Sequence, residues 1–133
     1  MRYITYNVFE VGVMKFKIIF YETVSGDIPV RDFLLKLDKK LRAKTVSLME
    51  VLEEKGNSLR EPYTKHLDDG IFELRCKLGS DLTRTLYFFY AGGNIVFTNG
   101  FVKKSVKTPA KEINLAKKYR ADFISRQEKV LSN

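Results

Sequence analysis

Three consecutive strand patterns between residues 72 and 102 constrain the fold of this chain more than any other feature. They cover Phe72–Leu78, Leu82–Tyr90 and Asn94–Val102. Gly79-Ser80 separates the first two patterns, and Gly92-Gly93 separates the last two. Two-residue loops that contain glycine favour the primed turns that join antiparallel strands. The sequence therefore predicts a three-stranded antiparallel meander.

The two turns also predict how the strands align. If each loop has two residues, Ala91 faces Asn94 across the second hairpin. In the same register Arg75 faces Arg84, and Arg84 faces Phe101. Two arginines in directly opposed positions destabilise a sheet unless an anion lies between them. Either both side chains reach solvent, or a one-residue bulge separates them, or they form a phosphate site; we favour the phosphate site.

Strand alternation assigns these residues to two different faces of the sheet. One face is expected to carry a group of cations near one end, namely Arg75, Lys77, Arg84 and Lys103, together with Phe101. The other face is expected to pack against helices through Phe72, Leu74, Cys76, Tyr87, Val96 and Val102. Arg84 should accordingly be an exposed side chain that contributes little to core packing.

The rest of the chain supplies a further strand and three helices. These elements are a strand at Lys15–Tyr21, a helix that opens at Pro29, a helix over Lys39–Lys55 that ends at Gly56, and a helix over Pro109–Lys129 with Thr108 as its N-cap. The first two helices are short and adjacent, so they should cover one face of the sheet as a helical hairpin. Residues 57–70 are polar and resemble a loop.

These elements predict one α+β domain over residues 1–133, with an antiparallel-dominated sheet and the order β-α-α-β-β-β-α. Residues 1–13 are either an N-terminal extension or an extra strand. No apolar run is long enough to span a bilayer, so we expect no membrane partner and a cytoplasmic protein. Cys76 is the only cysteine and cannot form an internal disulfide.

The positive charge of the chain is concentrated near its C-terminus. The formal net charge is +8. Residues 103–133 hold nine lysines and arginines against three acidic residues, a net charge of +6. A concentrated basic segment attracts polyanions through steering and counterion release. A solvated basic helix would look the same, but the nearby arginines favour a nucleic-acid partner.

The available side chains suit one reaction in particular. With one histidine, one cysteine and no carboxylates at ligand spacing, we expect no metal site and no cofactor. Cleavage of RNA by its own 2′-hydroxyl needs positioning, charge neutralisation and proton transfer. Arg75 and Arg84 could stabilise the phosphate. A lysine crowded by cations, or His66, could move the proton. The same groups could also merely bind RNA or DNA, and His66 could simply be an exposed loop residue.

Several segments resemble a known family. They are Ile71–Arg75 (IFELR), Arg84–Tyr90 (RTLYFFY) and, most specifically, Gly100–Ala116 (GFVKKSVKTPAKEINLA). They are similar to the HigB-like toxins of the RelE/ParE superfamily of type II toxin–antitoxin systems, including phage-derived members. The resemblance implies a RelE-like fold and ribosome-dependent cleavage of mRNA. It also implies neutralisation by a HigA-like antitoxin with a helix-turn-helix domain.

The resemblance also implies roles for single residues. Arg75 and Arg84 match the strand arginines that face RNA in these toxins. The basic motif that follows the last strand is matched by Lys103, Lys104 and Lys107. Some relatives use histidine and aspartate near the end of the last strand, and Asn99 and Gly100 stand nearby in this chain instead. We therefore expect Lys103 or His66 to move the proton, and RNA contacts from Lys77, Lys104, Lys107 and Tyr119. Tyr119 could instead be a core residue, as its helical spacing suggests.

Two other functions remain open from the sequence. A gyrase-poisoning toxin of the ParE kind would share the superfamily but lack RNase chemistry. A non-catalytic nucleic-acid-binding or phage regulatory module would use the same basic surface.

Overall fold

A computed structural model describes residues 15–104 and 107–132. The expectation for residues 1–13 lies outside these ranges. The elements are β1 (Lys17–Phe20), α1 (Pro29–Lys36), α2 (Lys39–Lys55), a 3-10 turn (Gly56–Ser58), β2 (Thr64–Asp68), β3 (Ile71–Leu78), β4 (Asp81–Tyr90), β5 (Asn94–Val102) and α3 (Ala110–Ser132). The expected α+β fold and its helical hairpin are confirmed.

The five strands form one mixed sheet in the order β1-β5-β4-β3-β2. β1 pairs in parallel with β5, while the other neighbours are antiparallel. β1 is an edge strand, and Ile18 N donates a 2.8 Å hydrogen bond to the Glu53 carboxylate on α2. That contact occupies a backbone group that an edge strand would otherwise leave unpaired.

β2 corrects the expectation of a loop over residues 57–70. Lys65, His66 and Asp68 are exposed on this strand, and its register shifts between His66 and Asp68. An irregular edge strand with few apolar residues lacks the alternation by which strands are recognised. The element order therefore contains four strands between α2 and α3, where the sequence predicted three.

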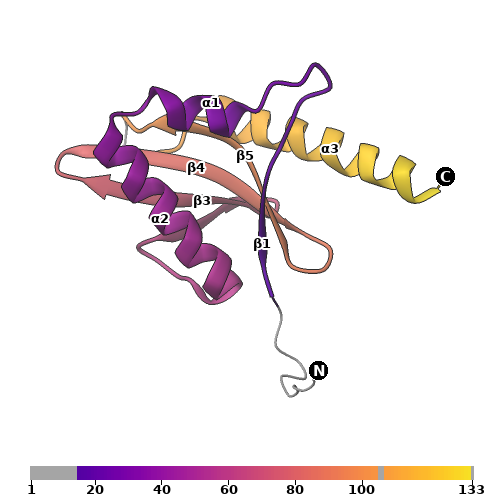
Figure 1. Ribbon diagram of the computed structural model, residues 1–133, viewed down its shortest axis with the longest axis horizontal. Helices are drawn as coiled ribbons and strands as arrows, with labels where there is room; N and C mark the ends of the chain where they lie inside the picture. Colours follow the sequence, from indigo (N-terminus) through magenta and orange to yellow (C-terminus); the bar gives the residue numbers. More distant parts are fainter. Residues whose placement is uncertain (1–14, 105–106, 133) are drawn as a thin grey trace.

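Helices cover both faces of the sheet (Figure 1). α1 and α2 pack on one face through a cluster of buried residues, namely Val30, Leu34, Met49, Leu52, Leu74, Tyr87, Ile95 and Phe97. α3 covers the other face, where the buried cluster is Tyr21, Ile71, Leu86, Phe88, Val96, Ala116 and Phe123. The C-terminal end of α3 extends past the sheet. No helix in the described ranges is long and apolar enough to cross a membrane.

The strand register agrees with the prediction where the arginines lie. Arg75 faces Arg84, and Arg84 faces Phe101. The second hairpin differs, because Asn94 faces Tyr90 and the loop has three residues instead of two. A register shift between Leu86 and Tyr87 compensates for the extra loop residue.

The position of Val96 follows from that irregularity. Val96 faces Phe88 and packs in the cluster beneath α3, which corrects its expected place on the α1–α2 face. A one-residue change of register moves a side chain to the opposite face.

Candidate nucleic-acid interface

Arg75 and Arg84 lie side by side on the sheet face that α3 covers, called here the arginine face. They face each other across β3 and β4, on the side away from α1 and α2, as predicted. Between them lies the carboxylate of Glu73, with Oε2 2.8 Å from Arg75 Nε and 3.5 Å from Arg84 Nε. The anion that separates the two arginines therefore belongs to the protein itself.

Glu73 is a central residue of this face. Its side chain is 1% exposed, and its second oxygen, Oε1, accepts a 2.5 Å hydrogen bond from the Thr108 hydroxyl. The sequence suggested Thr108 as the N-cap of the last helix. Its contact with Glu73 also ties Thr108 to the two arginines. A buried carboxylate is tolerated where it is paired and hydrogen-bonded, as it is here.

Arg84 is buried, which corrects the expectation that it is exposed. Only 6% of the residue is accessible to solvent. Nη1 donates a 3.1 Å hydrogen bond to the Thr83 carbonyl, and no described residue accepts a hydrogen bond from Nε. Burial lowers the pKa of the Arg84 guanidinium; Glu73 opposes this shift and Arg75 adds to it. Arg84 thus acts as an internal cation.

Arg75 is the arginine that a ligand can reach. Its side chain is 23% exposed, and its Nε is committed to Glu73. Nη1 lies 3.9 Å from the carboxylate of Glu61, whose side chain is 70% exposed. An exposed pair at that distance contributes little and is readily exchanged for another anion. The terminal nitrogens of Arg75 can therefore bind a phosphate.

Lys103 joins the arginine face from the end of β5. Its backbone N–H continues the strand pairing through a 2.8 Å hydrogen bond to the Leu82 carbonyl. Burial lowers the pKa of the Lys103 ammonium, and so do Arg84, Arg75 and Lys65; Glu73 acts in the opposite direction. A lowered pKa is the direction of shift that a general base requires.

Four cations thus surround one buried carboxylate. Lys65 is the fourth, because it faces Glu73 across β2 and β3. The cluster of Lys65, Arg75, Arg84 and Lys103 exceeds Glu73 by three positive charges when all are ionised. Such an excess favours binding of a polyanion.

A family model for phage-derived Gp49-like proteins matches residues 32–121. The chain belongs to this Gp49-like family. The match runs from α1 into α3 and includes every residue of the arginine face described above. No curated protein matches the chain.

The Gp49-like chain has a groove of about 570 Å³ next to Arg75. β2 begins at Thr64, opposite Leu74, so the outer edge of β3 beyond Arg75 is not covered by that strand. The groove passes over this edge toward α2. Its lining is mostly apolar and consists of Lys44, Ser47, Leu48, Val51, Pro62, Tyr63, Arg75, Cys76, Lys77, Leu82 and Arg84.

His66 does not join the arginines in this Gp49-like protein. It faces Phe72, whose ring lies 5.0 Å from the imidazole and packs on the α1–α2 face. His66 Nε2 accepts a 3.1 Å hydrogen bond from Gly70 N. The position of His66 favours Lys103 over His66 as the candidate base.

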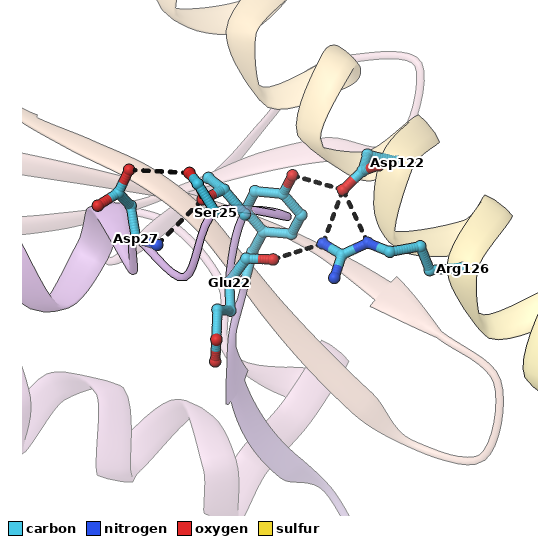
Figure 2. Close-up of polar contacts among 7 residues, drawn as sticks. Glu22, Ser25, Asp27, Asp122 and Arg126 are labelled. Atoms are coloured by element: carbon cyan, nitrogen blue, oxygen red, sulfur yellow. Dashed lines mark hydrogen bonds and ion pairs between the residues drawn. The ribbon is translucent and has the colours of Figure 1, made fainter.

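Tyr119 lies in the packing beneath α3. Its ring stacks on Tyr21 with centroids 4.6 Å apart. The Tyr21 hydroxyl donates a 2.6 Å hydrogen bond to Asp122, and burial together with Asp122 raises the pKa of Tyr21 to about 12. Figure 2 shows Arg126 reaching both Asp122 and the Glu22 carbonyl. Tyr119 thus belongs to a network that holds the end of β1 against α3, which supports the core alternative for this residue.

The remaining predicted RNA contacts lie around the arginine face. Lys77 lines the groove, and its carbonyl accepts a 2.5 Å hydrogen bond from Lys44 Nζ. Lys104 and Lys107 are exposed after β5. In residues 15–104 and 107–132, no three histidine, cysteine or acidic side chains group as metal ligands.

Sequence reasoning missed Glu73, Lys65 and Thr108. Glu73 stands two positions before Arg75, so alternation alone would have placed both on one face. Lys65 could be found only after β2 was recognised. The contact of Thr108 depends on how the segment before α3 meets the sheet, and no local pattern indicates it.

Proposed function

We propose that this Gp49-like protein is the toxin of a type II toxin–antitoxin system. In this proposal it is an endoribonuclease that cuts mRNA on the ribosome. The observation that carries the proposal is the cluster of Lys65, Arg75, Arg84 and Lys103 around Glu73. A reachable arginine beside a lysine with a lowered pKa supports the proposal, because RNA self-cleavage needs charge neutralisation and proton transfer.

The chemistry uses the 2′-hydroxyl of the RNA as the nucleophile. Its proton passes to the neutral amine of Lys103, and its oxygen bonds to the adjacent phosphorus. The bond from phosphorus to the 5′-oxygen then breaks, and that oxygen takes up a proton from water. The products are a 2′,3′-cyclic phosphate and a 5′-hydroxyl end. Arg75 neutralises the charge that develops on the phosphorane oxygens.

Arg84 supports this step without touching the phosphate. Its buried charge faces Arg75 and lowers the pKa of Lys103. Glu73 holds Arg75 Nε at 2.8 Å and so fixes the direction of the guanidinium. Fixed donors are effective in catalysis because they need no reorganisation during the reaction.

The partners in this proposal are mRNA, the ribosome and a HigA-like antitoxin with a helix-turn-helix domain. The antitoxin would neutralise the toxin. The exposed Lys104 and Lys107 would contact phosphates of the ribosome or the message.

Removing Lys104 or Lys107 is expected to weaken binding and leave the chemical step intact. Each lysine that contacts one phosphate should reduce the slope of log K against log salt by about one unit. Affinity for ribosomes, measured for Lys104→Ala and Lys107→Ala at several salt concentrations, checks this. Lys36→Ala, at the end of α1, serves as the control. An unchanged salt slope in both variants would remove these lysines from the interface.

Induced expression tests the proposed activity. The parent chain should stop protein synthesis within minutes, and primer extension should find new mRNA ends at positions in frame with translation. Arg75→Ala should lose both effects, whereas Arg31→Ala, an exposed arginine on α1, should retain them. DNA damage and filamentation without mRNA cuts would indicate a ParE-like gyrase poison. No growth effect would indicate a non-catalytic nucleic-acid-binding or phage regulatory module.

A further inference from the structure

Tyr63 is the exposed tyrosine of the described chain. Half of the residue, 50%, is accessible to solvent. Tyr21 and Tyr87 are buried, and Tyr119 is stacked on Tyr21. An exposed aromatic ring is a common surface feature by itself. The residues around Tyr63 point to a binding role for its ring.

Tyr63 lies directly beside Arg75. Its carbonyl accepts a 2.7 Å hydrogen bond from Arg75 N, which extends the β2–β3 pairing by one position beyond Thr64 and Leu74. Opposed residues of an antiparallel pair project to the same face, with their Cβ atoms about 5 Å apart. Tyr63 and Arg75 also line the same groove, so Tyr63 lies within reach of one nucleotide bound to Arg75.

The groove next to Arg75 has the chemistry of a nucleotide site. Tyr63, Pro62 and Leu82 contribute apolar surface, and Arg75 contributes a cation. A nucleotide presents the complementary pair of groups, a phosphate and a flat base. Stacking on an aromatic ring is sequence-tolerant because every base has a π-face.

We propose that Tyr63 is a stacking platform for a base of the RNA strand whose phosphate binds to Arg75. The inference rests on the proposed function for the identity of the strand, whereas stacking itself requires no cleavage. It assigns to Tyr63 the contact that the sequence suggested for Tyr119. The ligand class is a single-stranded ribonucleotide segment with at least one unpaired base.

A fluorescence measurement tests the contact directly. The chain contains no tryptophan, so Tyr63→Trp introduces a single indole. The probe is a six-nucleotide RNA with 2′-O-methyl riboses, which cannot be cut by 2′-hydroxyl attack. Binding should quench the fluorescence of Tyr63→Trp. The control Val130→Trp, at a 69% exposed position near the end of α3, should show no quenching. Equal responses from both variants would overturn the inference.

A binding cycle then separates stacking from phosphate contact. Tyr63→Leu should lower affinity for the probe by about 5- to 150-fold, the range of one base–aromatic stack. A series of probes, each with one abasic nucleotide at a different position, should include one that binds the parent protein more weakly by a similar factor. At that position the abasic change should cost Tyr63→Leu little. Full additivity at every position, or unchanged affinity of Tyr63→Leu, would refute the platform.

The outcomes for the platform and for the proposed activity are distinguishable. A parent protein that cuts mRNA, together with a Tyr63→Leu variant of unchanged affinity, would remove the platform alone. A parent that cuts no mRNA but stacks a base on the indole at position 63 would remove the proposed activity alone.

Discussion

Arg84→Ala is expected to abolish toxicity and also to lower the stability of the fold. Arg84 is 6% exposed, and its Nε lies 3.5 Å from Glu73 Oε2. Removing one partner of a buried ion pair typically costs about 3–5 kcal/mol. Glu73 keeps its shorter bonds to Arg75 and Thr108, so we expect about 2–3 kcal/mol in the free energy of unfolding, at or below the low end of that range. The rate of cleavage should also fall, because Arg84 faces Arg75 and lowers the pKa of Lys103.

Two further variants separate stability from activity. The double variant Arg84→Ala/Glu73→Gln should recover much of the lost stability, because it removes the buried charge that Arg84→Ala leaves behind. It should remain non-toxic. Arg120→Ala, which removes an arginine that pairs with Asp69, serves as the control and should stay toxic. Urea unfolding and growth after induction are the measurements. Growth arrest by Arg84→Ala at parental levels of soluble protein would contradict the role of Arg84.

Lys103→Ala is expected to lower the rate of the chemical step with little effect on binding to the ribosome. Burial, Arg84 and Arg75 lower the pKa of Lys103, which is the direction that favours a general base. Loss of a general base typically costs about 10²- to 10⁴-fold. Single-turnover cleavage on saturating ribosomes should therefore fall by that factor, while the affinity for ribosomes stays close to that of the parent. Lys104→Ala is the matched control, because it removes the adjacent lysine. Parental single-turnover rates in Lys103→Ala would refute this assignment, and a strong defect in His66→Ala would transfer the role to the histidine.

The pH dependence of cleavage gives an independent check on Lys103. A base must be deprotonated, so the single-turnover rate should rise with pH and level off above the pKa of Lys103. Burial and the cations Arg84, Arg75 and Lys65 lower that pKa, whereas Glu73 raises it. Glu73→Gln should therefore shift the rising limb to lower pH. A shift to higher pH, or no shift, would contradict the arrangement.

The helical hairpin and the alignment of the arginines could be predicted because local signals determine them. α2 matches the predicted range, Lys39–Lys55, and Gly56 ends it with a φ of 56°. The first hairpin follows from its Gly79-Ser80 turn, which places Arg75 opposite Arg84. Glycine turns and amphipathic spacing depend only on neighbours in the sequence. They can therefore be recognised without knowledge of the tertiary structure.

The environment of the arginines could not be predicted in the same way. Exposure of Arg84 was inferred from one sheet face being free, but α3 and the segment before it cover that face. Val96 lies on the face opposite to the predicted one, because the strand irregularity and the three-residue loop are determined by packing across the sheet. Tyr119 has the same helical spacing whether it packs or binds, and only its stacking on Tyr21 distinguishes the two.

The most direct test of the account uses two mRNAs on purified ribosomes. The first is entirely ribonucleotide, and the second carries a single 2′-deoxy nucleotide at the cut position. Attack by the 2′-hydroxyl predicts that the parent protein cuts the first message and leaves a 2′,3′-cyclic phosphate and a 5′-hydroxyl end. The second message should stay uncut on the same ribosomes. Equal cleavage of both messages, or cleavage of neither, would contradict this mechanism.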